Sequence, residues 1–505
     1  MSDSGCIRVP LAKYPGFNRF VLDWLRGDQR FLPREAARHR PAADFTSPPQ
    51  SLVDALIESN RRWGSFVGPE VRRWAAGGTV TLVAGQQVGF AGGPLYTLAK
   101  IATLLKMRRE LESEGTPATV FFWLATEDHD FNEVATLALQ AKERAQLDLV
   151  HVRTTRAVDS HATVGSLPLP ESLIVELLAI LGIERPQWLR PGITFRDSFA
   201  ELLATVLADE KVIFIDALLP ELRAQGAPLF DAINARWDEV QRAVGDRSRE
   251  IADAGYTPQV VPREAGEPYT LFFALDDDGN RIAYDRAHPP APERTSTSAI
   301  TRPLLQDSVI RPDVFVGGPA EIAYYAQIAP LYDLLGVRMP RIALRGHALV
   351  APKRVVRIFE RFSIQPADAF TNVDRLLADR EPEGVAEIRR LADEAREALA
   401  EKMTAIGELA LPAEHALARA INKSIGHIEY HFEKLTERSI RGLARKDRER
   451  FAAVRELVAT LHPDRHVQDR VVGWIAYWCE YRNLLTERLV DCIEPDSDHF
   501  RIISL

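Results

Sequence analysis

Short apolar runs alternate with helical patterns along the middle of the chain. The runs TVTLVAG (79–85) and ATVFFWLATEDHD (118–130) are apolar and β-rich until their ends, which predicts strands buried on both faces. Between them, residues 94–115 repeat leucine and isoleucine at helical spacing. Strand, glycine-rich turn, helix and strand make a βαβ unit, and this order predicts a parallel sheet covered by helices.

The same alternation returns later in the chain. Further strand patterns, with helical patterns beside them, are KVIFIDA (211–217), DVFVGGP (313–319) and RMPRIALRG (338–346). Two segments, 151–195 and 245–305, break the rhythm and are interpreted as insertions into one α/β core. The second contains a hairpin pattern, with two β-rich runs around the turn residues 277–280.

Residues 374–460 carry a charge-rich helical pattern. A heptad frame has apolar residues at seven of eight a and d positions, namely Val385, Ile388, Ala392, Ala395, Leu399, Ile406 and Leu409, with Lys402 as the exception. The same spacing continues at Ile421, Ile425, Ile428, Phe432 and Leu435. Two such helices around Pro412 predict an antiparallel coiled-coil hairpin. An apolar stripe left on the hairpin favours a homodimer over a hairpin folded back on its own core.

Composition narrows the class of protein. The net charge of −8 argues against a nucleic-acid surface. No stretch approaches the roughly 18 apolar residues of a membrane span, and the first residues lack the apolar core of a signal peptide. The three cysteines, Cys6, Cys479 and Cys492, have no zinc or CxxC spacing, and a disulfide framework is not expected. These features predict a reduced, cytoplasmic protein.

The turn after the first strand, AGQQVGFAGGPLYTLAK (84–100), is the first candidate site. Its candidate residues for substrate or nucleotide binding are Gly85, Gln86, Gln87, Gly89, Gly92, Gly93 and Tyr96. Glycines at a strand–helix junction let backbone N–H groups approach an anion, although the turn matches neither a P-loop nor GxGxxG. The alternative is a tight turn with packing glycines. Lys100 is interpreted as a solvated lysine.

The run ATEDHD at the end of the second strand is the second candidate. Carboxylates at the end of a buried strand suggest binding, proton transfer or a divalent ion, and histidine suits proton transfer near neutral pH. We assign Glu127, Asp128 and His129 as catalytic candidates and Asp130 as a binding candidate. The alternative reading has Asp130 capping a helix with Glu133 as its capping-box partner. A zinc site is not expected, because no set of spaced ligands is evident.

A second Gly-Gly-Pro junction, VFVGGPAEIAYYAQ, repeats the first at a like position. Two such turns suggest that both flank one crevice, with binding candidates Gly317, Gly318, Glu321 and Tyr324. The alternative leaves Glu321 as a carboxylate in the first turn of a helix, where the helix macrodipole favours it. Near the C-terminus, Gln468, Asp469 and Arg470 are interpreted as a helix start with a surface salt bridge.

These blocks together resemble the cysteine-adding enzyme family of bacillithiol biosynthesis. The resemblance lies in GQQVGFAGGPLYTLAK, FFWLATEDHDFNEV, STSAITRPLLQDSVIRPDVFVGGPAEIAYYAQ and the late QDR, which occur in the order of that family. The chain departs from the family pattern in having Ala84 for Thr, Asn132 for Asp, and Asp469 for the Glu of QER.

The resemblance implies a Rossmann-like parallel-sheet core with connecting-peptide insertions and an α-helical antiparallel coiled-coil domain that forms a homodimer. We expect a mostly helical segment at 1–75, the core at 76–372, the hairpin at 373–462 and a C-terminal segment that returns to the core at 463–505. The implied activity joins L-cysteine to the amino group of glucosaminyl-malate, the last step to bacillithiol.

An unactivated carboxylate is a poor acyl donor, so ATP, with Mg²⁺ on its phosphates, is expected as co-substrate. In this hypothesis, His129 deprotonates the attacking amine, and Glu127, Asp128 or Asp130 holds the ammonium of cysteine or the Mg²⁺. No tightly bound cofactor is expected. Two alternatives remain: a non-catalytic binding or scaffold protein that recruits a partner through its coiled coil, and a nucleotidyl- or glycosyltransferase on the same core.

Overall fold

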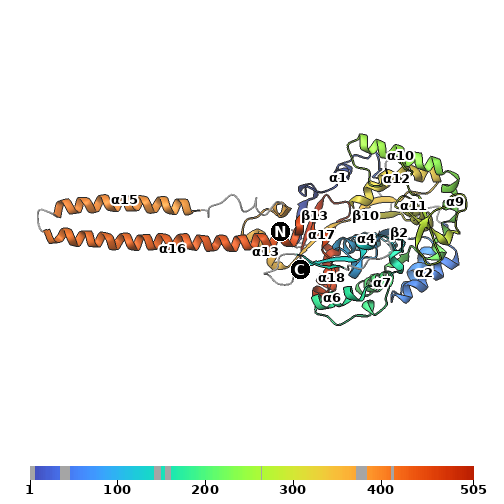
Figure 1. Ribbon diagram of the computed structural model, residues 1–505, viewed down its shortest axis with the longest axis horizontal. Coiled ribbons are helices and arrows are strands. Elements are labelled where there is room, and N and C mark those ends of the chain that lie inside the picture. Colours follow the sequence, from blue (N-terminus) through green and yellow to red (C-terminus); the bar gives the residue numbers. More distant parts are fainter. Residues whose placement is uncertain are drawn as a thin grey trace. The chain divides into compact units, whose positions relative to one another are not determined.

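The computed structural model describes residues 6–34, 46–140, 149–153, 161–262, 264, 266–370, 384–410 and 415–505. The chain divides into two compact units. The first comprises the chain up to Lys353 together with Leu461–Leu505, and the second comprises Arg354–Thr460. Every strand of the described residues belongs to the first unit (Figure 1).

The centre of the first unit is a five-stranded sheet with the order β11-β10-β2-β3-β6, in which every neighbouring pair is parallel. Its strands are β2 (Val80–Gln86), β3 (Ala118–Leu124), β6 (Ile213–Asp216), β10 (Val314–Gly317) and β11 (Arg341–Leu344). Four lie within predicted strands and β2 extends one residue beyond its predicted run, so the prediction of a parallel α/β core is confirmed. All residues of β3 are buried, which explains its unbroken apolar sequence.

The strand order places two distant segments side by side at the centre of the sheet. In chain order β2 is the first strand of the sheet and β10 the fourth, yet they pair directly. The chain therefore reverses the direction in which it adds strands between these two. This is the order of Rossmann-like folds, which bind ligands beyond the carboxyl ends of the strands at that point.

Helix α4 (Leu95–Ser113) packs against β2 and β3 on one side, while α17 (Gln468–Val471) and α19 (Asn483–Cys492) cover it on another. Most of its residues are consequently buried, Lys100 among them. The interpretation of Lys100 as a solvated lysine is wrong, because its side chain is buried against the end of β2 and pairs with Glu321.

The other elements of the first unit complete the layers around the sheet (Figure 1). The helices are α1 (Arg19–Leu25), α2 (Gln50–Arg62), α3 (Gly68–Ala75), α5 (Phe131–Val134), α6 (Glu171–Leu181), α7 (Phe195–Val206), α8 (Pro220–Gln225), α9 (Ala227–Ala235), α10 (Trp237–Asp253), α11 (Thr301–Val309), α12 (Pro319–Leu335) and α18 (Ile475–Tyr481). Strands β4 (Thr136–Gln140) and β5 (Leu149–Arg153) form an antiparallel pair.

The predicted hairpin in the second insertion is confirmed. Strand β7 (Phe272–Leu275) pairs with β8 (Arg281–Ala283) and, on its other side, with β9 (Thr295–Thr297). The Asp276 side chain closes the turn by accepting hydrogen bonds from the backbone N–H groups of Asp278 and Asn280. This three-stranded sheet brings the side chain of Arg281 toward the ends of the central strands.

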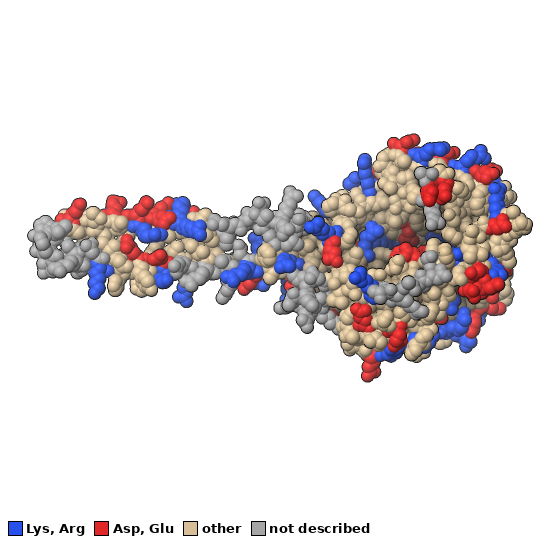
Figure 2. Space-filling view, viewed as in Figure 1, with Lys and Arg blue, Asp and Glu red and all other residues tan. Residues whose placement is uncertain are grey.

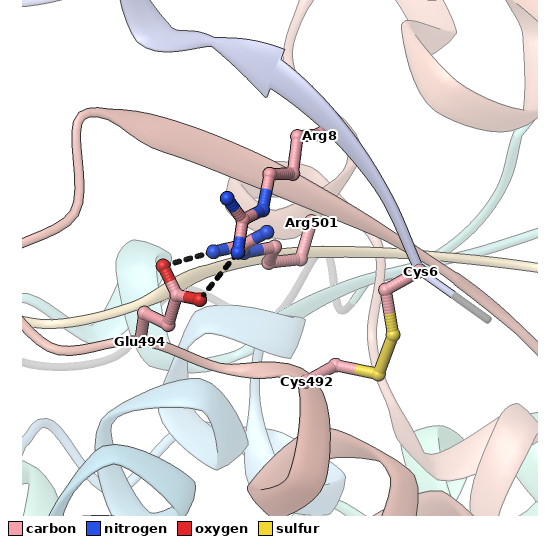
Figure 3. The surroundings of a disulfide bond; sticks show 5 residues. All are labelled: Cys6, Arg8, Cys492, Glu494 and Arg501. Atoms are coloured by element: carbon pink, nitrogen blue, oxygen red, sulfur yellow. Dashed lines mark hydrogen bonds and ion pairs between the residues drawn. A yellow bond between two sulfur atoms is a disulfide. The ribbon is translucent and has the colours of Figure 1, made fainter. Parts of the chain in front are cut away.

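A second, small sheet joins the two ends of the chain. Strand β1 (Cys6–Pro10) pairs antiparallel with β13 (His499–Ser504), which pairs with β12 (His347–Ala351). This pairing places Cys6 beside Cys492, and the two form a disulfide (Figure 3). The prediction of reduced cysteines is wrong for this pair. Because 486 positions separate the two residues, only the pairing of β1 with β13 brings them together.

The second unit consists of α13 (Lys353–Arg361, which begins at its boundary), α15 (Val385–Ala410) and most of α16 (His415–Leu461). The two long predicted helices are confirmed, and α16 has 47 residues. Among the predicted heptad positions, Val385 and Ala392 are buried, whereas Ile406 and Leu409 are exposed. Pro412 and the side chain of Ile421 lie outside the described part of the chain. Acidic and basic side chains are interspersed along the hairpin (Figure 2).

Candidate functional site

A pocket of about 620 Å³ opens at the carboxyl ends of β2, β3 and β10. Gly85 and Gln86 reach it from β2, residues 127–129 follow β3, and Gly318 follows β10. The second insertion contributes its opposite wall, with Tyr269, Phe273 and Arg281. The pocket therefore occupies the position at which Rossmann-like folds bind ligands.

The structure brings most of the predicted site residues together. Those that line the pocket are Gly85, Gln86, Gln87, Tyr96, Glu127, Asp128, His129, Gly318, Glu321 and Tyr324. Those outside its lining are Gly89, Gly92, Gly93, Asp130 and Gly317. Both strand–helix junctions reach this one pocket, but of the two Gly-Gly-Pro turns only the second contributes to its lining, through Gly318 and Pro319.

The two junctions are tied together by an ion pair. Lys100 Nζ lies 2.5 Å from Glu321 Oε2 and donates to the carbonyl of Gly85 at 2.7 Å and to Gln86 Oε1 at 3.0 Å. Glu321 also accepts the backbone N–H of Gly318 at 2.8 Å, so it stabilises the first turn of α12, as the alternative reading held. Burial lowers the pKa of Lys100, and the charge of Glu321 opposes that shift.

Glu127 is buried, and both of its carboxylate oxygens are occupied. Oε2 accepts from Arg223 Nη2 at 2.9 Å, from Ser296 Oγ at 2.9 Å and from the backbone N–H of Thr297 at 3.0 Å. Oε1 accepts from Thr297 Oγ1 at 2.5 Å. Glu127 thus fastens β9 and α8 to the end of β3, and these bonds hold it as an anchor of the pocket wall rather than as a mobile proton acceptor.

Asp128 and His129 stand at the acidic end of the pocket together with Arg281. Asp128 accepts from Gln87 Nε2 at 2.6 Å and from the backbone N–H of His129 at 2.7 Å. Burial works to raise the pKa of Asp128, but the hydrogen bonds from His129 and the charge of Arg281 prevail and lower it. Asp128 is therefore a carboxylate at neutral pH.

The imidazole of His129 contacts a guanidinium. Arg281 Nη1 lies 3.1 Å from His129 Nδ1. An arginine only donates hydrogen bonds, so Nδ1 accepts in this contact when it carries no proton; Asp128 Oδ1 lies 3.5 Å from the same nitrogen and competes for it as an acceptor.

The structure makes Asp130 the cap of α5 and Glu133 a pocket residue, whereas the sequence suggested Asp130 for binding. Asp130 Oδ1 accepts the backbone N–H of Glu133 at 3.1 Å, so Asp130 caps α5 outside the pocket. Glu133 lines the pocket instead. Burial raises the pKa of Glu133, and the charges of Asp128 and Asp130 add to the effect. The signal was present in the sequence, because Glu133 follows the acidic run by three residues.

Three arginines form the basic end of the pocket, and none was predicted. Arg302, Arg345 and Arg470 all line it. Arg302 Nη2 donates to Tyr324 OH at 2.7 Å, and the Arg345 guanidinium lies 5.5 Å from the centre of the Tyr96 ring. Arg302 lies in α11, Arg345 directly after β11, and Arg470 in α17. These three segments are distant in the sequence and meet only in the folded chain.

The glycines of the first junction serve packing rather than the pocket. The N–H groups of Gly89, Gly92 and Gly93 donate to backbone carbonyls within the turn. A Cβ on Gly92 would lie 2.2 Å from the ring of Trp474, whose Nε1 donates to the Gly92 carbonyl at 2.9 Å. Positive charge at the pocket therefore comes from lysine and arginine side chains, and not from the amides of these three glycines.

The interpretation of QDR as a helix start is confirmed, since α17 begins at Gln468, but the salt bridge is buried and not on the surface. Gln468 and Asp469 are buried, and Asp469 Oδ2 lies 2.9 Å from Arg345 Nη1. Arg470 is exposed and lines the pocket. A four-residue helix, too short to show a periodic pattern, lies here between α4 and β12, which is why the sequence did not reveal its burial.

The fold and pocket define a Rossmann-like protein with a small-molecule site and a helical hairpin. Two family models match the chain: "Bacillithiol biosynthesis BshC, N-terminal Rossmann-like domain" at residues 29–289 and 285–346, and "Bacillithiol biosynthesis BshC, C-terminal coiled-coil domain" at residues 348–505. The chain belongs to the BshC family of bacillithiol biosynthesis. The Rossmann-like core and the coiled-coil domain expected from the resemblance are thus confirmed.

Relatives match over most of the chain. A protein of Solibacter usitatus is 32% identical over 493 residues, which cover 92% of this chain and 91% of the relative. One of Koribacter versatilis is 28% identical over 539 residues, covering 97% and 98%. One of Bacillus anthracis is 27% identical over 359 residues, covering 65% and 66%. Each of these relatives carries the name "Putative cysteine ligase BshC".

Proposed function

We propose that this chain is a ligase that joins L-cysteine to the amino group of glucosaminyl-malate through an amide bond, as the last step of bacillithiol biosynthesis. Family membership and the names of the relatives support a cysteine ligase. The observation that carries the proposal is one pocket with a basic end and an acidic end, at the ligand-binding edge of a Rossmann-like sheet.

The basic end suits the malyl group of the substrate. Malate carries two carboxylates, and arginine binds carboxylates through paired N–H donors. Arg302, Arg345 and Arg470 converge on the pocket, and Tyr96 and Tyr324 lie beside them. In this proposal the arginines hold the malyl carboxylates and thereby direct the amino group of the sugar toward the acidic end.

The acidic end suits two amino groups, the ammonium of cysteine and the attacking amine of the sugar. Asp128, ionised and held by Gln87, would bind the ammonium of cysteine. The attacking amine must lose a proton, and two groups are proposed to take it. His129 can do so when its contact with Arg281 opens. Glu133 is the second, since its raised pKa makes it a better proton acceptor than an ordinary carboxylate.

Activation of the cysteine carboxylate requires a co-substrate, for which we propose ATP with Mg²⁺ on its phosphates. Lys100 and whichever pocket arginine the two malyl carboxylates leave unbound supply the positive charge that phosphates need. Among the described residues no group of three or more His, Cys, Asp or Glu could hold a metal ion, so the Mg²⁺ would enter on the nucleotide. Binding and orientation are then the tasks of this chain's residues.

Reconstitution tests the proposal directly. The purified chain, ATP, L-cysteine and glucosaminyl-malate are incubated, and mass spectrometry detects the amide product. Formation of AMP with pyrophosphate, or of ADP with phosphate, identifies the mode of activation. Thermal stabilisation by the substrates without any product would contradict the ligase and favour the binding or scaffold alternative. Transfer of a nucleotidyl or sugar group would favour the transferase alternative.

Variants of the acidic end separate the two candidate bases. His129→Ala and Glu133→Gln are compared at saturating substrates across pH 6 to 9. The variant that removes the proton acceptor is expected to lower kcat by roughly 100-fold and to abolish the acidic limb of the pH profile. Asp130→Asn weakens the cap of α5 and removes one of the charges that raise the pKa of Glu133, so it is expected to shift the acidic limb without lowering the maximal kcat if Glu133 is the base. Wild-type kcat in both variants would exclude both residues from proton transfer.

We also propose that the chain forms a homodimer through its hairpin. Ile406, Leu409, Ile428 and Leu435 occupy predicted heptad positions and are exposed. Burial of such a stripe against a second copy is the usual way in which coiled-coil helices cover it.

We also propose a cytoplasmic location, because the chain belongs to a family of bacillithiol biosynthesis. No helix among the residues that the structure describes is long and apolar enough to cross a membrane. Disulfides are rare in the cytosol, so the Cys6–Cys492 bond makes the location testable. Alkylation of thiols in intact cells is expected to trap Cys6 and Cys492 as free thiols, and the disulfide of the structure is then expected to form only after the cells are opened to air. Recovery of the oxidised pair from cells would contradict the proposal.

A further inference from the structure

Helix α17 carries three successive polar residues with three different surroundings. Gln468 Oε1 accepts the backbone N–H of Val350 at 2.7 Å, and its Nε2 donates to the Val350 carbonyl at 2.8 Å. Gln468 thus binds both the backbone N–H and the carbonyl of Val350, which fixes α17 to β12. Arg470 reaches the pocket, and Asp469 lies between them with 1% of its surface exposed.

Asp469 is paired with a pocket arginine. Its Oδ2 lies 2.9 Å from Arg345 Nη1, and neither side chain is more than 4% exposed. Burial works to raise the pKa of Asp469, yet the charge of Arg345 prevails and lowers it, so the carboxylate is ionised. His347 Nδ1 lies 3.6 Å away, and burial lowers the pKa of His347 to about 4. With His347 neutral, Asp469 balances the charge of Arg345.

Arg345 lies where the two central strands end. Its backbone N–H donates to the carbonyl of Gly317 at 2.8 Å, and its guanidinium is 5.5 Å from the centre of the Tyr96 ring. A Cβ on Gly318 would lie 3.6 Å from Arg345 Nε. Arg345 therefore spans the junctions after β2 and β10, and besides its pair with Asp469 its Nη1 donates to the carbonyl of Gly346 at 3.1 Å.

We propose that Asp469 is a positioning residue, which acts through Arg345 to hold one guanidinium ready for a carboxylate of the substrate. This inference rests on the proposed function, in which the basic end binds the malyl group. The C-terminal segment then does more than cover α4, because α17 supplies one pocket arginine and orients another. A buried arginine that has lost its counter-ion would turn toward other acceptors.

Removal of the negative charge tests the positioning role. Asp469→Asn keeps the shape of the side chain and is expected to raise KM for glucosaminyl-malate at least tenfold, with KM for cysteine changed less than twofold. In isothermal titration with L-malate alone, Kd is expected to rise by the same factor. Equal changes in both KM values, or changes that scale with the loss of Tm, would overturn the proposal and leave a structural ion pair.

A double-mutant comparison tests whether Asp469 acts through Arg345. The variant Arg345→Ala is expected to match Asp469→Asn in KM for glucosaminyl-malate, and the double variant is expected to be no worse than Arg345→Ala alone. Independent, multiplicative effects in the double variant would contradict the coupling.

Two further variants distinguish a positioning role of Asp469 from a general loss of stability. Asp469→Glu keeps the charge and shifts it by one methylene, so it is expected to raise KM for glucosaminyl-malate two- to fivefold at nearly wild-type Tm. An unchanged KM in this variant, together with an unfolded Asp469→Asn, would overturn the proposal. Glu210→Gln breaks the ion pair with Arg108 outside the pocket, and it is expected to lower Tm without changing either KM.

The L-malate titration separates failure of this inference from failure of the proposed function. If the wild-type chain makes no product but binds L-malate, and Asp469→Asn weakens that binding, Asp469 keeps its positioning role while the ligase proposal fails. If the wild-type chain makes product and Asp469→Asn leaves both KM and Kd unchanged, the ligase proposal stands and the positioning role is wrong.

Discussion

The compact unit and the hairpin use the same charged residue types in opposite ways. In the compact unit, the pairs Arg223–Glu127 and Arg345–Asp469 are almost wholly removed from solvent. In the hairpin, Arg390 pairs with Glu387 and Glu394 one helical turn away on either side, and all three side chains are more than half exposed. The first kind of pair joins segments that are distant in the chain, whereas the second joins neighbours on one helix.

This difference decides what each charge contributes. A buried ion pair is costly to form, but removing one partner leaves an uncompensated charge in a poorly polarisable interior. An exposed pair on a helix surface is screened by water and contributes little. Charges in the compact unit therefore specify which segments meet around the pocket. Those of the hairpin keep a long helical surface hydrated, while its exposed apolar residues remain available to a second copy.

The largest expected effect comes from breaking a buried pair. Glu127→Gln removes the counter-ion of Arg223, a side chain with no exposed surface, and is expected to lower the free energy of unfolding of the compact unit by about 3–5 kcal/mol. Urea unfolding measures the change. The matched control in the hairpin is Glu387→Gln, for which no shift of the unfolding midpoint is expected. Equal effects of the two changes would contradict the distinction between the units.

The disulfide sharpens the comparison, because all three cysteines belong to the compact unit. Replacing Cys6 and Cys492 with serine removes a cross-link that closes a very long loop, and the expected loss is about 3–4 kcal/mol of unfolding free energy. Calorimetry with and without a reducing agent should show the same lowering of Tm for this unit alone. Cys479→Ser is the control. A Tm that is insensitive to reduction would rule out this contribution.

Two buried titratable groups in the compact unit contribute to the free energy of unfolding with opposite pH dependence. Burial raises the pKa of Asp307 from 3.8 to about 6, so this group favours folding at low pH, and its contribution is lost as the pH rises toward 6. Burial lowers the pKa of His347 from 6.5 to about 4, so its contribution is present at neutral pH and is lost as the pH falls toward 4. In the wild-type chain the two contributions nearly cancel.

Single variants reveal the cancellation. Asp307→Asn leaves only the His347 contribution, so the unfolding free energy is expected to rise by about 3 kcal/mol, relative to wild type, between pH 4 and pH 6.5. His347→Gln should give the opposite slope. Urea unfolding at half-unit steps of pH measures both slopes. Parallel curves for wild type and both variants would show that neither group titrates differently in the folded and unfolded chain.

The smallest expected effect on the stability of the compact unit comes from the exposed apolar residues of the hairpin. The double change Ile406→Lys with Leu409→Lys is expected to halve the mass measured by light scattering and to leave unfolding of the compact unit unchanged. Glu408→Lys, a change of charge on the same helix, is the control and should keep the dimer. A wild-type chain of monomeric mass would contradict the homodimer.

The central strands, their helices and the long hairpin helices were predictable, because each is encoded locally by apolar periodicity and by turn residues. The site was partly predictable for the same reason. Residues at strand ends, such as Gln86, Asp128 and Gly318, lie at the carboxyl edge of a parallel sheet wherever the strands pair. Asp130 was assigned as a binding candidate, and only the alternative reading, from its spacing to Glu133, gave the cap that the structure shows.

The residues that were missed depend on contacts between distant segments. Lys100 looks solvated until the end of β2 and Glu321 of α12 meet around its side chain. Arg281 and Arg302 reach the pocket only because Glu127 holds β9 and because the insertion folds against the strand ends. No local pattern in the sequence distinguishes these arginines from those of the hairpin surface.

The sequence by itself determined the order of strands and helices along the chain, the two Gly-Gly-Pro junctions and the acidic run. These features depend on backbone propensity and apolar spacing, which act over a few residues. The tertiary structure alone decided which charges are buried, which arginines face the pocket, and that Cys6 meets Cys492. The reason is physical: burial and charge compensation depend on what lies beside a residue in space, and for Arg345 that neighbour is Asp469, on the far side of the entire hairpin in the chain.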